Sequence, residues 1–264
     1  MNTAALQDAV SIIRQSHRFL AQAQDLSPHN AGVTSSLTRL VRSLMDCYAS
    51  DISASLVGAP DLQKARQELP VLCGKAECEM EKFWAQRLAD TPTAQLADFW
   101  YYSEYCALTQ AEIGLLGTKT YSRISFLGAG ALPLTGFLMA DHFADAQVVC
   151  VDYDEDACSL AARLARKFGY ADRVDVRCMA ATDYRPEAGE LVICASLLTH
   201  RADVYARLGD CDCALIVRDA EGAYQFLYRP AVLPGAGFAR VSKTEPDPKR
   251  INTSHFYIRD NGHG

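Results

Sequence analysis

The sequence predicts an α/β fold, in which an all-helical N-terminal domain precedes a Rossmann-like sheet, from three observations. Up to about residue 116, apolar residues recur at the three-to-four spacing of amphipathic helices. From about residue 120 on, short and nearly continuous apolar runs alternate with helical stretches, as in a parallel sheet covered on both faces. The first of these runs ends in a glycine-rich turn. We therefore expect a helical domain over residues 1–119 and an α/β domain over residues 120–264.

Within the helical part, glycine and proline are expected to separate successive helices. One face of the first helix carries Leu6, Val10, Ile13 and Leu20. The expected breaks are Pro28, Gly58 with Pro60, Pro70, and Thr91 with Pro92. Threonine followed by proline is typical of a helix start, so residues 91–92 are expected to begin a further helix, which Gly117 ends.

Five apolar runs predict the parallel strands of the α/β part. They are "RISFL" (123–127), "QVVCVD" (147–152), "VDVRC" (174–178), "ELVICA" (190–195) and "CALIVRD" (213–219). Helical stretches fill residues 132–143 and 154–169 between the first three runs. Two more runs, at 237–243 and 254–260, follow without an obvious long helix between them, so we expect an antiparallel hairpin at the end of the sheet.

Composition excludes several classes of protein. A net charge of −6 without a basic run argues against a nucleic-acid partner. The first twenty residues lack the basic end and apolar core of a signal peptide. The longest apolar run, 127–140, is too short and too rich in glycine and proline to span a bilayer. The ten cysteines form no C-x-x-C pair. We therefore expect a cytoplasmic protein with reduced thiols and no membrane segment.

The glycine-rich turn predicts a nucleoside-containing cofactor. Gly128, Ala129 and Gly130 follow the first strand, where small residues let backbone N–H groups approach a ligand. Asp152 ends the second strand and can accept hydrogen bonds from ribose hydroxyls. Position 133 is proline, so the third glycine of the dinucleotide fingerprint is missing, and no basic residue near the turn would bind a pyrophosphate. S-adenosylmethionine fits better, while NAD and a plain strand–helix turn stay open.

The acidic stretch "DYDEDACSLAAR" does not predict a calcium site. Asp152, Asp154 and Asp156 alternate as in an EF-hand, but that loop needs glycine at its sixth position and glutamate at its twelfth. Those positions hold Ala157 and Arg163. We expect no metal site in the protein.

Six stretches, in order from Leu72 to Arg259, resemble nicotianamine synthases. "FLGAGALPLTG" is similar to the family's G-S-G-P-L-P-L-T signature, and "VDYDEDA" to its acidic segment. "LCGKAECEMEKFW" resembles C-G-x-A-E-x-x-L-E, and "DFWYYSEYCALTQAE" resembles F-P-Y-Y-x-N-Y. "LIVRDAEGAYQFLYRP" resembles R-S-A-H-G-x-x-x-F-L-Y-P, and "RINTSHFYIR" resembles the closing I-N-S strand.

This resemblance implies a class I methyltransferase-type sheet and an unusual use of S-adenosylmethionine. The family transfers the 3-amino-3-carboxypropyl (aminobutanoyl) arm and releases methylthioadenosine. Plant members condense three donors. Short bacterial members, which this chain resembles in length, add one arm to the amine of histidine on the way to opine metallophores such as staphylopine and pseudopaline. That branch implies a functional link to an opine dehydrogenase and a metallophore exporter.

Departures from the plant pattern concern the acceptor more than the donor. Trp100 replaces the proline of F-P-Y-Y, and Glu104 replaces the asparagine before the last tyrosine. Asp219-Ala220-Glu221 replaces S-A-H. These positions are where the resemblance implies an acceptor pocket, so they leave the identity of the acceptor open.

Glu77 is the expected general base, with Glu81 one turn on as the other candidate. Glu77 lies in an otherwise apolar helical stripe with Cys73, Met80, Trp84 and Leu88. Partial desolvation there would raise the pKa of its carboxyl, as a base for the attacking amine requires. Without the resemblance, a surface acid paired with lysine or arginine explains either glutamate equally well.

Tyr102 and Tyr105 are expected at the acceptor, where a phenol would orient the amine and aromatic faces favour the sulfonium. Tyr102 is expected to share a helical face with Phe99 and Cys106. Core tyrosines are the alternative. Arg218, at the end of the fifth strand, is expected to hold a substrate carboxylate or else to pair with Asp219 or Glu221.

The remaining expected contacts complete the set. Asn252 is a further candidate for substrate. The expected contacts to the donor are Gly128, Ala129, Gly130, Pro133, Leu134, Thr135, Asp152, Tyr153, Ala181, Asp183 and Ser196.

Two other functions stay open at this point. The α/β part alone would also suit a methyltransferase with a helical cap, or a module that senses S-adenosylmethionine without turnover. The segment with Glu77 and Tyr102 favours aminobutanoyl transfer, because neither alternative needs it. A homodimer through an apolar helical face is a further expectation.

Overall fold

The computed structural model describes residues 3–49, 52–235, 237–245, 247 and 249–260, and its contacts group the chain into two units. The first consists of Met1–Phe83, Asp219–Pro230 and Pro246–Thr253. The second consists of Trp84–Arg218, Ala231–Glu245 and Ser254–Gly264. The first unit thus takes in two segments that follow the sheet strands in sequence. The predicted domain boundary between residues 119 and 120 stays a prediction.

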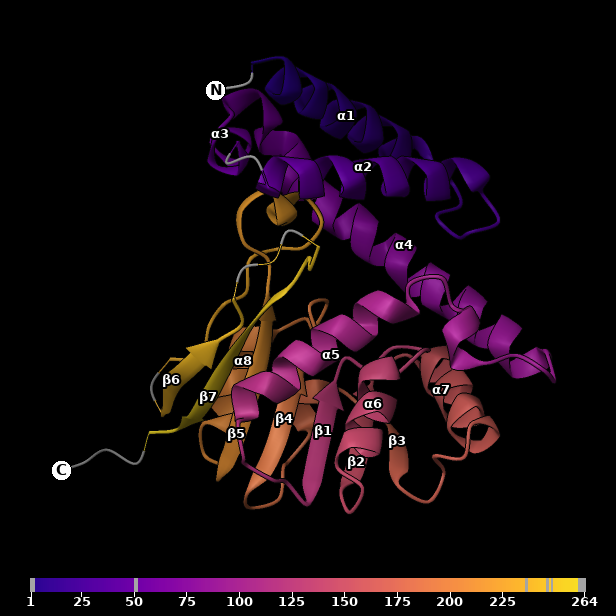
Figure 1. Ribbon diagram of the computed structural model, residues 1–264, viewed down its shortest axis with the longest axis vertical. Coiled ribbons are helices and arrows are strands. Elements are labelled where there is room, and N and C mark those ends of the chain that lie inside the picture. The colour runs from indigo at the N-terminus through magenta and orange to yellow at the C-terminus, as the bar shows by residue number, and fades with distance from the viewer. Residues whose placement is uncertain (1–2, 50–51, 236, 246, 248, 261–264) are drawn as a thin grey trace. The chain divides into compact units, whose positions relative to one another are not determined.

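The first unit is built on helices α1 (Thr3–Gln22), α2 (Ala31–Ala49) and α3 (Ser53–Val57), with the 3-10 helices η1 (Pro60–Leu62) and η4 (Gly222–Phe226) (Figure 1). It also contains helix α4 (Gln63–Asp90) up to Phe83. Helix α1 buries Ala9, Ile13, Ser16 and Leu20, a single stripe at three-to-four spacing. Two residues of the predicted face, Leu6 and Val10, are only half-buried.

Helix α4 corrects one predicted break and one predicted helix start. Pro70 lies inside this helix of 28 residues and does not end it. Thr91 and Pro92 do not begin a helix, because α4 ends at Asp90 and a turn follows. Proline is common just after a helix end as well as in the first turn of a helix, since it cannot continue the helix that precedes it. The next helices are η2 (Leu96–Asp98) and α5 (Tyr102–Leu116), and α5 ends before Gly117 as predicted.

The second unit contains a seven-stranded sheet of order β3-β2-β1-β4-β5-β7-β6 (Figure 1). Its strands are β1 (Arg123–Leu127), β2 (Gln147–Asp152), β3 (Val174–Cys178), β4 (Glu190–Cys194), β5 (Cys213–Asp219), β6 (Phe238–Lys243) and β7 (Thr253–Arg259). The first five pair in parallel, and β6 pairs with β7 in the antiparallel sense. The predicted fold class, a class I methyltransferase-type sheet with a helical N-terminal region, is confirmed.

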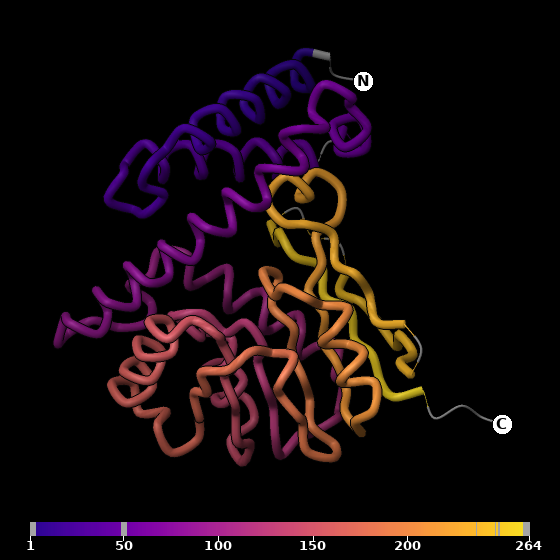
Figure 2. The backbone as a smooth tube through the Cα atoms, turned by 180° about the vertical axis from the view of Figure 1, so that it is seen from behind, coloured from indigo at the N-terminus to yellow at the C-terminus, as the bar shows by residue number. Residues whose placement is uncertain are grey.

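Helices cover both faces of the sheet. Helix α6 (Leu134–His142) packs on the face of β2 that carries Val148 and Cys150. Helix α8 (Arg201–Leu208) packs on the opposite face (Figure 2). Its Leu208 shares a buried cluster with Val149 and Val151. Helix α7 (Glu155–Lys167) connects β2 to β3. Helix α8 was not predicted from the sequence.

Two further expectations concern membrane-spanning segments and the state of the cysteines. Within the described ranges, no helix combines the length and the apolar character needed to cross a membrane. All ten cysteines are free thiols, and six of them are buried: Cys47, Cys73, Cys150, Cys158, Cys194 and Cys213.

Candidate active site

The glycine-rich turn after β1 is fixed to the end of β2 by three amide hydrogen bonds. Gly128 and Ala129 donate to the carbonyl of Val151 at 2.9 and 3.0 Å, and Gly130 donates to Oδ2 of Asp152 at 2.8 Å. The φ angles of Gly128 and Gly130 are +76° and +68°, a region that glycine enters without a Cβ penalty. These three N–H groups therefore face β2, which corrects the prediction that they face a ligand.

Asp152 ends β2 with both carboxylate oxygens already oriented. Oδ2 accepts from Gly130, and Oδ1 accepts from the amide of Asp154 at 3.0 Å. Each carboxylate oxygen has two lone pairs, so each keeps acceptor capacity for a ribose hydroxyl. Asp154 in turn caps α7 by accepting from the amide of Ala157 at 3.1 Å. Asp152 and Asp154 thus each bind backbone amides, Asp152 at the glycine turn and Asp154 at the start of α7.

The glycine missing from position 133 is supplied at position 136. Pro133 stands at the N-cap of α6, where no helical hydrogen bond needs its N–H. A Cβ on Gly136 would lie 2.5 Å from Sγ of Cys150 and 3.6 Å from Val148. Close packing of helix on strand is the task of the third glycine in the dinucleotide fingerprint. Gly136 performs it here. The fingerprint does not predict this role, because it places its third glycine at position 133.

The predicted donor residues divide into edge residues and interior residues. Pro133, Leu134 and Thr135 have buried side chains, and those of Leu134 and Thr135 are 0% exposed. The contact of these three residues with the donor stays a prediction. They shape the start of α6. Gly128 and Gly130 are half-exposed, whereas Ala129 is buried.

The other predicted donor residues follow the carboxyl ends of parallel strands. Tyr153 comes after β2 and is 72% exposed. Ala181 and Asp183 bound the 3-10 helix η3 (Ala181–Asp183) after β3, and Ser196 follows β4. Because parallel strands end at one edge of a sheet, these residues belong to the edge that carries the glycine turn. Their contact with a donor stays a prediction.

Arg218 is buried in an ion pair that the sequence did not predict. Its Nε and Nη2 donate to the two carboxylate oxygens of Glu112 at 2.8 and 2.9 Å. The two side chains are 4% and 0% exposed. The bidentate edge of the guanidinium, which was expected to hold a substrate carboxylate, is therefore occupied by Glu112. Glu112 was missed because nothing in its local pattern separates it from a surface glutamate of α5.

In the first unit, Glu77 of α4 accepts a hydrogen bond from Tyr228. The phenol oxygen lies 2.6 Å from Oε2 of Glu77, the short distance typical of a hydroxyl donating to a carboxylate. The chain after β5 brings Tyr228 there by docking η4. In that docking, Tyr224 stacks on Tyr48 at 4.9 Å between ring centroids, and the amide of Ala223 donates to the hydroxyl of Ser53. Tyr228 was not singled out from the sequence.

The predicted stripe around Glu77 is mixed in its burial. Cys73 and Leu88 are buried, while Glu77 itself is half-buried. Burial raises the pKa of the Cys73 thiol to about 12, and the nearby charge of Glu77 adds to the increase. Glu81, one turn further along α4, is half-buried as well. The assignment of either glutamate as a base stays a prediction.

Tyr102 and Tyr105 have different surroundings. Tyr102 was predicted to share a helical face with Phe99, but Phe99 lies before the start of α5, so this prediction is wrong. Burial, followed by a hydrogen bond with Cys106, raises the pKa of Tyr102. The ring of Tyr105 lies 6.1 Å from that of Phe99 and 6.0 Å from that of Tyr101. Tyr105 therefore belongs to an aromatic cluster with Phe99 and Tyr101.

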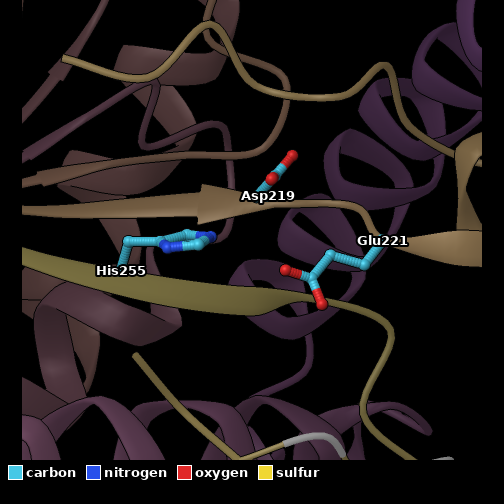
Figure 3. A group of neighbouring side chains, drawn as sticks. All are labelled: Asp219, Glu221 and His255. Atoms are coloured by element: carbon cyan, nitrogen blue, oxygen red, sulfur yellow. The ribbon is translucent and has the colours of Figure 1, made fainter. Parts of the chain in front are cut away.

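The segment after β5 carries an acidic pair. Asp219 ends β5, Glu221 follows two residues later, and their carboxylate oxygens lie within 4.8 Å of one another (Figure 3). Both residues are half-buried. They occupy the place of S-A-H in the plant pattern. Asn252, just before β7, is half-buried, and β7 carries His255, which is 2% exposed.

The similarity to a known protein family extends over nearly the whole chain. The family described as "Nicotianamine synthase protein" matches residues 3–259. Nicotianamine synthase 9 of Hordeum vulgare is 32% identical over 254 residues, which cover 89% of this chain and 74% of that protein. Nicotianamine synthase 2 of Oryza sativa subsp. japonica is 33% identical over 262 residues, which cover 90% and 78%.

Solved structures agree on the fold. The crystal structure of MtNAS in complex with MTA and tNA superposes with a TM-score of 0.79, at 20% identity, over 96% of this chain and 97% of that one. A variant of MtNAS in complex with S-adenosylmethionine gives a TM-score of 0.77, at 20% identity, over 94% and 97%. From the family match and the identity to the plant enzymes, the chain belongs to the nicotianamine synthase family of S-adenosylmethionine-dependent transferases, which use that molecule as a substrate.

Proposed function

We propose that the protein transfers the 3-amino-3-carboxypropyl arm of S-adenosylmethionine to the α-amino group of an amino acid, with histidine as the acceptor, and releases methylthioadenosine. The donor follows from the family. MtNAS, which shares the fold, binds MTA, the nucleoside that remains when this arm has left. The proposed setting is the bacterial opine-metallophore branch in the cytoplasm, with an opine dehydrogenase acting on the product and an exporter carrying it.

The observation that carries the proposal is the pair of Glu77 and Tyr228. In the reaction, the lone pair of a neutral amine attacks the γ-methylene of the sulfonium, and the C–S bond breaks with its electrons going to sulfur. The new secondary ammonium then loses one proton. Free amines are mostly protonated near neutral pH, so a base must take a proton before or during the attack. A half-buried carboxylate held by a phenol at 2.6 Å suits that task.

The acidic pair of Asp219 and Glu221 supports a cationic acceptor. Two carboxylates within 4.8 Å of one another attract positive charge more strongly than the serine and histidine of the plant pattern. Histidine offers an α-ammonium group and an imidazole that is close to its titration point at neutral pH. The plant enzymes' nicotianamine-forming condensation of three donors does not require an imidazole pocket. We therefore assign the departures at these two positions to acceptor choice.

Product analysis tests the proposal. Purified protein is incubated with S-adenosylmethionine and, in parallel, with histidine, alanine, glutamate or no acceptor. We expect methylthioadenosine in amounts that match a histidine adduct about 101 Da heavier than the free amino acid, because a C4H8NO2 group replaces one hydrogen. S-adenosylhomocysteine in place of methylthioadenosine would support the methyltransferase alternative, and tight donor binding without either product would support the sensor.

The base is tested separately with a matched pair of variants. Glu77→Gln removes the carboxylate but keeps its shape, and we expect turnover to fall by ~100-fold or more with unchanged donor affinity. Glu79→Gln makes the same change at an exposed position of α4 and is expected to keep full turnover. Equal turnover of the two variants would remove Glu77 from the mechanism. Loss of activity in Glu81→Gln alone would transfer the role to Glu81.

A further inference from the structure

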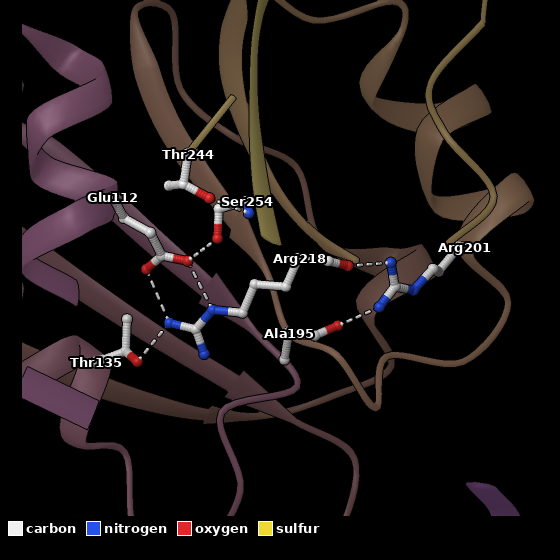
Figure 4. Close-up of polar contacts among 7 residues, drawn as sticks. All are labelled: Glu112, Thr135, Ala195, Arg201, Arg218, Thr244 and Ser254. Atoms are coloured by element: carbon white, nitrogen blue, oxygen red, sulfur yellow. Dashed lines mark hydrogen bonds and ion pairs between the residues drawn. The ribbon is translucent and has the colours of Figure 1, made fainter. Parts of the chain in front are cut away.

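The pair of Glu112 and Arg218 is the centre of a buried polar network in the second unit (Figure 4). Nη2 of Arg218 also donates to the hydroxyl of Thr135 at 2.8 Å. The hydroxyl of Ser254 donates to Oε1 of Glu112 at 2.7 Å, and the amide of Ser254 donates to the hydroxyl of Thr244 at 3.0 Å. All five side chains are buried, the most exposed at 4%. The network thus joins α5, α6, β5 and β7.

Stability alone is a weak explanation for such a network. Removing two charges from water costs several kcal/mol, and well-packed apolar residues often serve stability as well or better. A fully paired network of charges does, however, fix the directions of the elements that it joins, because each donor needs its acceptor at a set distance and angle. The question is which part of the molecule needs that fixed direction.

Thr135 connects the network to the glycine turn. It is the second residue of α6, and only Ala131, Leu132 and Pro133 stand between Gly130 and the start of this helix. Its side chain is 0% exposed and its hydroxyl accepts a hydrogen bond from Arg218. Thr135 therefore supports the start of α6 from the buried interior. A shift of the first turn of α6 would move the turn's glycines relative to Asp152.

A second arginine extends the same control to the loop after β4. The carbonyl of Arg218 accepts from Nη1 of Arg201 at 2.8 Å (Figure 4). Nη2 of Arg201 donates to the carbonyls of Ala195 and Ser196, both at 2.8 Å. A Cβ on Gly128 would lie 3.2 Å from Cβ of Ala195, so the loops after β1 and β4 touch. Arg218 is therefore linked to both loops, through its side chain to one and through its carbonyl to the other.

We propose that Glu112 and Arg218 are positioning residues for the donor, and that the hydroxyl of Thr135 is the contact through which they set the glycine turn. Glu112 holds the guanidinium in place, Arg218 holds the start of α6, and the turn presents its ligand-facing side at a fixed distance from Asp152. None of the three side chains needs to touch S-adenosylmethionine. The proposal rests on the proposed function only for the identity of the donor.

The test compares three threonine variants by calorimetric titration of the whole protein with S-adenosylmethionine. Thr135→Val keeps the shape but loses the acceptor, and we expect its Kd for the donor to rise about tenfold, which corresponds to about 1.4 kcal/mol. Thr135→Ser keeps the hydroxyl and is expected to stay within about threefold of the wild type. The control is Thr109→Val. Thr109 is 1% exposed on the same helix as Glu112, and its hydroxyl has no hydrogen-bond partner among the described residues.

The possible outcomes distinguish a role in positioning the glycine turn from a role in the stability of the fold alone. If Thr135→Val and Thr109→Val lower the melting temperature alike but only the first weakens donor binding, the proposal stands. If Thr135→Val binds the donor within about twofold of the wild type, or if Thr135→Ser fails to restore binding, the proposal is overturned.

Steady-state kinetics provides a second, independent measurement. A positioning role predicts a higher KM for S-adenosylmethionine in Thr135→Val and an unchanged KM for the acceptor. A fall in kcat alone contradicts it. Because the titration needs no acceptor, a wild type that binds the donor but does not react with histidine would refute the proposed acceptor and leave this inference standing.

Discussion

The hydrogen bond from Tyr228 to Glu77 gives the sharpest single perturbation of the proposed chemistry. Tyr228→Phe removes one oxygen and leaves the ring in place. The lost bond, 2.6 Å long and made to a carboxylate, belongs to the class that is worth about 1.5–3 kcal/mol. If all of it orients the base in the transition state, kcat should fall by about 10- to 100-fold, since about 1.4 kcal/mol is tenfold in rate.

The assay is the initial rate of methylthioadenosine release at saturating S-adenosylmethionine and histidine, with KM measured for each substrate. KM for the donor should not change, because the glycine turn and Asp152 do not take part in the Tyr228 bond. Tyr121→Phe is the matched control. Tyr121 is a half-buried tyrosine just before β1, and the same change there should leave kcat within about twofold. A Tyr228→Phe enzyme with wild-type kcat would refute the reasoning that this phenol orients the base.

Two predictions concern the stability of the sheet. Gly136→Ala should destabilise the protein by about 1–3 kcal/mol in urea unfolding, because the added Cβ would meet Sγ of Cys150 at 2.5 Å, and Cys150→Ala in the same chain should recover part of the loss. Burial raises the pKa of Cys150 and of Cys194 to about 12. The stability that these protonated thiols contribute is fully present below the pKa of an unfolded thiol, about 8.5, and is lost as pH rises toward the folded pKa. The free energy of unfolding should therefore fall between about pH 9 and pH 11. A rise in the free energy of unfolding over this range would contradict the burial argument.

Much of the fold could be predicted because it depends on local patterns. The parallel strands and the helices α6 and α7 leave apolar runs of the right length, and the closing hairpin leaves two more. Helix α8 was missed since its eight residues are too short for a clear period. The break expected at Pro70 was wrong because a proline decides only its own backbone, whereas the packing of a long helix decides whether the helix continues through it.

Prediction of the site was limited by partners that lie far apart in the sequence. The edge of the sheet that is expected to bind the donor could be predicted from Gly128 and Asp152, because both follow strands that the sequence predicts. The pairs that organise the site are separated by 106 residues for Glu112 and Arg218 and by 151 for Glu77 and Tyr228. No local pattern tells a glutamate which distant side chain it will meet. Gly136 carried a signal that the sequence did contain, a glycine on the packed face of α6, but at an unfamiliar spacing.

The central claim is that the aminobutanoyl arm, and not the methyl group, leaves S-adenosylmethionine. Its most direct test uses two labelled donors, one with the label in the methyl group and one with the label in the carboxyl group of the arm, each incubated with histidine and the wild-type protein. The account predicts that the carboxyl label enters the amino-acid product and that the methyl label stays with methylthioadenosine. Methyl label in the amino-acid product, with the carboxyl label retained on the nucleoside, would contradict it.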